Sequence, residues 1–212
     1  PFHSDWARKR ATSILENATT ITVRDQKSKE TVKKLINKEV SVVSDLVLAN
    51  PPTIPQVIPQ KDLVILSPRY WQKGHENTQK ALQEFVHYLC ASQKKYIIGI
   101  PFEKNNERDL KMLAEIFNQP GVKDQSEIWN NYQNEDEVLQ KIAEAELLVG
   151  MRLHSLIFAH LTSTPLIGIS YMEKVAGVLG ALTTKEHLLE LSGLTSEYLK
   201  KAYLSACPKA SS

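Results

Sequence analysis

From residue 63 onward, short apolar segments alternate with longer amphipathic ones, and this alternation restricts the fold more than any other feature of the chain. Strand-like segments are expected at residues 63–67, 96–100, 127–129, 147–149 and 166–169. Helical spacing of apolar residues fills most of the stretches between and after them, at residues 77–92, 107–117, 135–144, 175–181 and 196–205. Strands joined by helices form right-handed crossovers, so the sequence predicts a parallel sheet with helices on both faces, an α/β, Rossmann-like domain over residues 61–212.

Two of these helices have a face that can be predicted. The first places Ala81, Leu82, Phe85, Val86 and Leu89 on one side. The second is expected to turn Leu110, Leu113, Ala114 and Phe117 toward the sheet. Both stripes follow the spacing of a helix that is buried along one face.

The first 50 residues are typical of part of another α/β unit. A helix is expected over residues 5–17 with Ser4 as its N-cap, then a strand at 19–23, a helix over 27–36 behind Asp25, and a strand at 40–43. Two strands make a poor independent sheet, so residues 1–50 are expected to be the trailing part of an incomplete N-terminal Rossmann-like domain. Residues 51–60 contain four prolines and are expected to form a stiff linker.

Composition excludes several classes of protein. The chain has 212 residues, 42% hydrophobic and 24% charged, with a net charge of +2, which is ordinary for a globular protein and gives no nucleic-acid footprint. Its two cysteines, Cys90 and Cys207, form no zinc or disulfide pattern, which fits a reducing compartment. No P-loop, Gly-x-Gly-x-x-Gly or Asp-x-Asp motif occurs, so we expect neither a metal nor a bound cofactor.

Cationic side chains follow three of the predicted strands. Arg69 comes after the strand at 63–67, Arg152 and His154 come after Gly150, and Tyr171 and Lys174 come after the strand at 166–169. Open α/β sheets bind ligands beyond the carboxyl ends of their strands, and a helix that begins there adds free N–H groups for an anion. The alternative is structural: a surface charge at Arg69, Arg152 or Lys174, and a capping or core histidine at His154.

Two further positions have a functional and a structural interpretation. Arg24 and Asp25 end the first strand of the N-terminal segment, where they could contact a ligand, although a structural pair with Asp25 as N-cap is favoured. Trp129 is expected to be a packing residue, with stacking on a sugar as the alternative.

Five segments resemble the polysaccharide pyruvyl transferase family, and they follow one another in the order that the family has. The most specific is residues 148–159, which contain the Gly-Met-Arg-Leu-His sequence at positions 150–154. The others are a Thr-Val-Arg-Asp element at 22–25 with Ser28, the strand end at 42–45, an arginine and tryptophan element at 66–71, and a Tyr-x-x-Lys-Val element at 171–175. Pro68 departs from the family pattern and affects the expected path of that loop.

The resemblance implies a GT-B-like arrangement and a transferase that moves a pyruvyl group from phosphoenolpyruvate to a sugar diol, forming a ketal. Arg152, Leu153 and His154 match the donor-binding signature, His154 is the expected catalytic residue, and Arg69, Tyr171 and Lys174 are expected to bind substrate. The acceptor would be a bacterial cell-surface glycan, exopolysaccharide or lipid-linked precursor. The expected location is the cytoplasm, including peripheral association with the inner face of the membrane.

Two other hypotheses share this fold, because a fold does not determine a function. One is a glycosyltransferase that uses a nucleotide sugar, and the other is a non-catalytic binding domain. The chain begins at Pro1 and does not contain the Gly-rich region expected at the start of the family, so we expect a fragment, which could be inactive alone.

Overall fold

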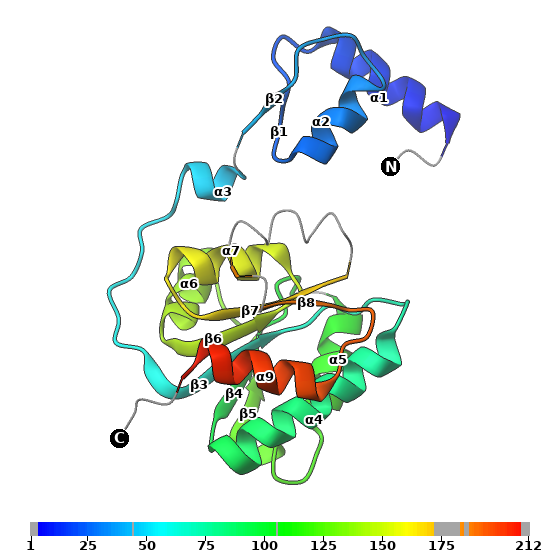
Figure 1. The fold of residues 1–212 in the computed structure, drawn as a ribbon. Coiled ribbons are helices and arrows are strands. Elements are labelled where there is room, and N and C mark those ends of the chain that lie inside the picture. Colours follow the sequence, from blue (N-terminus) through cyan, green and yellow to red (C-terminus); the bar gives the residue numbers. More distant parts are fainter. Residues whose placement is uncertain (1–3, 44, 105, 172–182, 185–186, 209–212) are drawn as a thin grey trace. The chain divides into compact units, whose positions relative to one another are not determined.

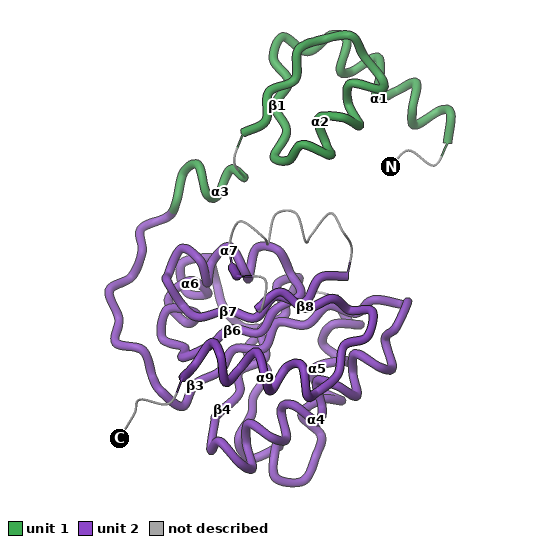
Figure 2. Tube along the Cα trace, in the orientation of Figure 1, with its two compact units in different colours: residues 1–51 green, residues 52–212 purple. Residues whose placement is uncertain are grey.

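The computed structural model describes residues 4–43, 45–104, 106–171, 183–184 and 187–208. The chain divides into two compact units, residues 1–51 and residues 52–212 (Figure 2). No helix in the described part of the chain is long and apolar enough to cross a membrane.

In its described residues, the first unit contains two short parallel strands and three helices. The helices are α1 (Asp5–Asn17), α2 (Gln26–Lys33) and α3 (Leu46–Ala49), and the strands are β1 (Thr22–Val23) and β2 (Ser41–Val42). Ile21, Ile36 and Val40 form its small buried core. The predicted caps are confirmed, because Ser4 accepts a hydrogen bond from the N–H of Ala7 and Asp25 accepts one from that of Ser28.

The second unit is built on a six-stranded sheet in which every neighbouring pair is parallel, in the order β5-β4-β3-β6-β7-β8. The strands are β3 (Gln60–Ser67), β4 (Tyr96–Gly99), β5 (Ser126–Ile128), β6 (Ala145–Gly150), β7 (Leu166–Ser170) and β8 (Leu188–Glu190). The order reverses between β3 and β6, which lie side by side in the sheet but far apart in the sequence. The predicted Rossmann-like parallel sheet is confirmed.

Helices cover both faces of this sheet (Figure 1). One face carries α4 (His75–Gln93), α5 (Glu107–Phe117) and α9 (Ser196–Ala206), and the other carries α6 (Glu135–Ala143) and α7 (Leu153–Leu161). The buried cluster on the first face includes Val64 and Leu66 of β3 but not the fully buried Ile65 between them. Successive side chains of a strand point to opposite faces, so both faces of the sheet are packed.

The element boundaries agree with most of the sequence predictions. The helix at 107–117 is confirmed residue for residue, and the one expected over 77–92 begins two residues earlier. The apolar stripe of α4 is confirmed, whereas that of α5 is rotated: Met112, Leu113, Ile116 and Phe117 are buried and Ala114 is exposed. The short helix α3 and the short strand β8 were not predicted. The helix expected at 175–181 lies outside the described residues.

Candidate functional site

The site is centred on the carboxyl ends of β3 and β6, where the strand order of the sheet reverses. The chain leaves β3 toward α4 on one face of the sheet and leaves β6 toward α7 on the other. Open α/β sheets bind ligands at such a point. The two strand ends are tied together, because the N–H of Met151 donates to the carbonyl of Ser67 at 2.9 Å and the N–H of Arg69 contacts the Met151 sulfur at 3.3 Å.

Gly150 allows α7 to begin close to the sheet. A Cβ atom at this position would lie 2.6 Å from the Ser155 hydroxyl and 3.0 Å from a methyl group of Leu148. Gly150 is not among the residues with positive φ, so the glycine is needed for close packing between strand and helix rather than for a special turn.

The amino end of α7 presents backbone donors at this edge. Arg152 is the N-cap residue, its side chain makes no capping hydrogen bond, and its carbonyl accepts from the N–H groups of Ser155 and Leu156. Among the described residues, no backbone acceptor outside the helix is bonded to the N–H of Leu153 or His154. Free N–H groups and the positive end of the helix dipole favour an anion.

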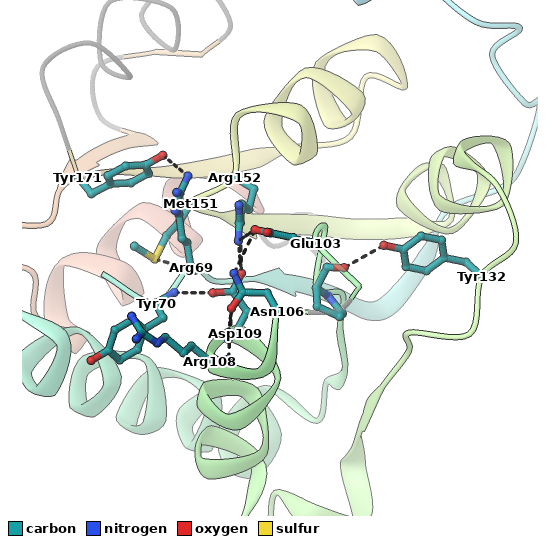
Figure 3. Close-up of polar contacts among 11 residues, drawn as sticks. Arg69, Tyr70, Glu103, Asn106, Arg108, Asp109, Tyr132, Met151, Arg152 and Tyr171 are labelled. Carbon is teal, nitrogen blue, oxygen red and sulfur yellow. Dashed lines mark hydrogen bonds and ion pairs between the residues drawn. The ribbon is translucent and has the colours of Figure 1, made fainter. Parts of the chain in front are cut away.

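Arg152 is held by two carboxylates (Figure 3). Its Nε donates to Asp109 at 3.2 Å, its Nη2 donates to the same oxygen, and Nη2 also donates to Glu103 at 2.8 Å. The side chain of Asp109 is 1% exposed and that of Glu103 is 58% exposed, so one partner is buried and the other lies in solvent. The surface-charge interpretation of Arg152 is therefore wrong, since its own side chain is only 14% exposed.

These contacts shift the ionisation of the cluster. Burial alone would lower the pKa of the Arg152 guanidinium, but the hydrogen bond and charge of Asp109, followed by those of Glu103, raise it above its usual value. The hydrogen bond from Asn106, and next that from Arg152, lower the pKa of the Glu103 carboxyl, with a further contribution from the charge of Arg69. Both shifts favour the charged forms of Arg152 and Glu103 at neutral pH.

Arg69 is fixed by aromatic side chains. Its Nη1 donates to the Tyr171 hydroxyl at 2.8 Å, and its guanidinium carbon lies 5.1 Å from the centre of the Tyr171 ring and 5.9 Å from that of Trp71. The two rings contact each other at 4.7 Å between centroids. Among the described residues, no carboxylate lies within ion-pair distance of Arg69, so its charge is available to a ligand.

The structure brings most of the predicted site residues to this one edge. Arg69, Arg152, Leu153, His154 and Tyr171 all follow β3, β6 or β7 directly. His154 is exposed in the first turn of α7 and has no hydrogen-bond partner among the described residues, which excludes the buried-core interpretation.

Lys174, the remaining predicted binding residue, lies outside the described residues.

Sequence reasoning missed Asp109 and Glu103. Asp109 lies on the buried stripe of α5, three and four residues before Met112 and Leu113, so an acidic residue at the start of an apolar stripe was the available signal. Glu103 stands in the loop after β4, where no pattern distinguishes it. Its pairing with Arg152 depends on tertiary structure alone.

Outside this edge, the structural interpretations hold. Asp25 caps α2, and Arg24 donates to Asp45, the N-cap of α3, at 3.3 Å. Trp129 is partly buried and packs against Tyr132 at 5.4 Å between ring centroids. Within the described residues, no group of three His, Cys, Asp or Glu side chains is arranged to hold a metal ion.

Comparison with known proteins gives a family and a fold. The sequence model of the family described as polysaccharide pyruvyl transferase matches residues 1–173. A solved structure of a TarM variant from S. aureus, in complex with fondaparinux, alpha-GlcNAc-glycerol and UDP, is similar with a TM-score of 0.59 and 13% identity over 98% of this chain. This chain spans 43% of the TarM chain, and the likeness confirms the predicted GT-B-like fold class.

A second solved structure, an alpha,alpha-trehalose 6-phosphate synthase from Burkholderia multivorans, has a TM-score of 0.45 and 12% identity, with 95% of this chain and 41% of that chain covered. No curated protein matches the sequence significantly.

Proposed function

The chain belongs to the polysaccharide pyruvyl transferase family, and we propose that it moves the pyruvyl group of phosphoenolpyruvate to two hydroxyls of one glycan sugar, forming a ketal. The observation that carries the proposal is that Arg69 and the amino end of α7 both follow strand ends at the carboxyl edge of the sheet. Together they supply a cation that has no carboxylate partner among the described residues and a set of backbone N–H donors.

Phosphoenolpyruvate carries two anionic groups, a phosphate and a carboxylate. Guanidinium offers a planar pair of donors to either group, and a helix N-terminus suits a phosphate. Arg69 and the N–H groups of Leu153 and His154 therefore form the first half of the proposed donor site. Arg152 forms the second half through the Nη2 side of its guanidinium, which contacts the exposed Glu103. The expected roles of Tyr171 and Lys174 in binding belong to the same proposal.

The reaction balances without a metal or a redox partner. One sugar hydroxyl adds to carbon 2 of phosphoenolpyruvate, the methylene carbon takes up a proton, the phosphate leaves, and a second hydroxyl of the same sugar closes the ketal. Of the two hydroxyl protons, one ends on the new methyl group and one on phosphate. We assign proton transfer to His154, because an exposed imidazole is a common general acid and base in enzymes, whereas arginine stays charged.

The direct test combines binding and turnover. The chain is titrated calorimetrically with phosphoenolpyruvate and, separately, with UDP- and GDP-sugars, and is then incubated with phosphoenolpyruvate and glycosides that have neighbouring free hydroxyls. Pyruvyl transfer requires acceptor-dependent release of phosphate and a product heavier by one pyruvate less one water. Binding of a nucleotide sugar without binding of phosphoenolpyruvate would favour the glycosyltransferase hypothesis instead.

The role of His154 has its own test. His154→Ala is expected to lower turnover by about 10²- to 10⁴-fold, the usual contribution of general acid–base catalysis, while the affinity for phosphoenolpyruvate changes much less. His87→Ala is the matched control, because His87 is also exposed on a helix but lies on α4. Turnover of His154→Ala near the wild-type rate would rule out His154 as the proton-transfer group.

Family membership also suggests an acceptor and a location for the reaction. We place the acceptor among cell-surface glycans and their lipid-linked precursors, by way of family membership alone. A chain that acts on such precursors would work at the cytoplasmic face of the membrane. Cofractionation of pyruvyl transfer activity with membranes, reversed by salt, would support peripheral association.

A further inference from the structure

Asp109 connects the two strand ends that form the site. One carboxylate oxygen accepts the N–H of Tyr70, in the loop after β3, at 2.8 Å. The other accepts the Nε of Arg152, after β6, at 3.2 Å, and its Nη2 as well. A single side chain on α5 therefore connects the loop that carries Arg69 to Arg152, the N-cap residue of α7 (Figure 3).

The burial of Asp109 makes this connection rigid. Within the described part of the chain, it is the only buried residue with a carboxylate, and a buried carboxylate is tolerated only when its oxygens are fully hydrogen-bonded. Asp109 lies in the first turn of α5, after the N-cap residue Asn106, where the positive end of the helix dipole stabilises a carboxylate. Loss of any one partner would leave a charge in the protein interior.

The geometry leaves part of Arg152 available. Asp109 accepts hydrogen bonds from the Nε and from one side of the Nη2 of Arg152. The remaining contact of the guanidinium is with Glu103, an exposed carboxylate on the loop after β4. Asn106 also donates to Glu103 at 3.0 Å, so the start of α5 holds both partners of Arg152. Asp109 is thus the fixed partner and Glu103 the one that solvent reaches.

We propose that Asp109 is a positioning residue for anion binding: it fixes the Arg152 guanidinium and the Arg69 loop in the geometry that receives the donor. This inference rests on the proposed function in naming phosphoenolpyruvate as the anion. Asp109 itself does not touch the donor and acts through Arg152 and through the backbone of Tyr70.

The test is the affinity of the full chain for two probes, phosphoenolpyruvate and inorganic phosphate, measured by calorimetry. Asp109→Asn keeps the shape of the side chain and one acceptor oxygen. It removes the negative charge, so Arg152 then faces either the amide nitrogen or a neutral oxygen. We expect the dissociation constant for phosphoenolpyruvate to rise about 10- to 100-fold, the range that corresponds to losing a hydrogen bond to a charged group. Asp109→Glu, which keeps the charge but adds a methylene in a packed site, is the second variant and is expected to weaken binding in the same direction.

Glu146→Gln is the matched control. Glu146 is a partly buried carboxylate paired with Lys95, and it lies at the opposite end of β6 from the site. The substitution is expected to lower the melting temperature without changing either dissociation constant. Equal loss of affinity in both variants would mean that destabilisation alone explains the effect, and would overturn the inference.

A double-mutant cycle separates positioning from a merely structural role. In an Arg152→Gln background, the binding penalty of Asp109→Asn is expected to shrink, because its route through Arg152 is gone and only the route through the backbone of Tyr70 remains. Unchanged, additive penalties would overturn the inference while leaving pyruvyl transfer standing. If the wild-type protein binds phosphate but not phosphoenolpyruvate, and the cycle measured with phosphate is non-additive, the proposed donor would be overturned and the inference supported. Binding of neither anion would overturn both.

Discussion

Replacing Gly150 by alanine is expected to destabilise the second unit and to displace the start of α7. The added Cβ would lie 2.6 Å from the Ser155 hydroxyl, 3.0 Å from a Leu148 methyl group and 3.2 Å from a Leu156 methyl group. All three neighbours are fully buried, so they have little room to move. Overpacking of this kind costs about 1–3 kcal/mol.

The size of the effect can be converted into a melting temperature. For a protein of this length, 1 kcal/mol corresponds to about 2–4 °C, so Gly150→Ala is expected to lower the melting temperature by roughly 2–12 °C. Thermal unfolding followed by circular dichroism measures this. Because α7 begins three residues later, the affinity for phosphoenolpyruvate is expected to fall as well.

A second substitution tests whether the close contact is the cause. Ser155→Ala removes the nearest atom, at the cost of the hydrogen bond from the Ser155 hydroxyl to the Arg152 carbonyl, about 0.5–1.5 kcal/mol. The double variant is therefore expected to lose less stability than the two single variants added together. Additive losses, or a Gly150→Ala protein as stable as wild type, would refute the packing argument.

Two further outcomes are expected from the same structure. Arg69→Lys should raise the dissociation constant for phosphoenolpyruvate, because lysine lacks the planar pair of donors and stacks less well on Trp71 and Tyr171; an unchanged constant would contradict the assignment of Arg69 to the donor site. Burial raises the pKa of the Cys90 and Cys207 thiols from 9.0 to about 11, so above pH 9 they ionise first in the unfolded chain. The free energy of unfolding should therefore fall between about pH 9 and 11, and urea titrations should find a smaller fall in Cys207→Ser.

The sequence predicted the sheet because its strands and helices are long enough to carry a periodic signal. The apolar runs that became β3, β4, β6 and β7 are bounded by turn residues, and a chain of crossovers leaves few topologies to choose from. The elements that were missed, α3 and β8, have four and three residues. Elements this short span at most about one and a half periods of their pattern, which is too little for a repeat to be recognised, so only tertiary contacts reveal them.

The site was predicted in part, and the part that was missed has one cause. Arg69 and Arg152 were found because strand ends can be located in a sequence and parallel strand ends meet at one edge of a sheet. Asp109 was missed because the stripe of α5 was placed one position too far along: it included Leu110 and Ala114 and left out Asp109, Met112 and Ile116. An acidic residue inside an apolar stripe is a sign of a buried ion pair, but its partner is 43 residues away and no local pattern names it.

The charges at the site explain how Arg152 can be both paired and able to bind. The formal charges of Arg69, Arg152, Asp109 and Glu103 cancel, so net charge does not attract an anion to this edge. Fixed local donors must do so instead, namely the Arg69 guanidinium and the amino end of α7. Of the two carboxylates on Arg152, the buried Asp109 cannot be displaced without leaving a charge unpaired, whereas Glu103 can exchange its contact for water because it is exposed. A ligand carboxylate that competes for Arg152 is therefore expected to replace Glu103 and to leave the pair with Asp109 in place.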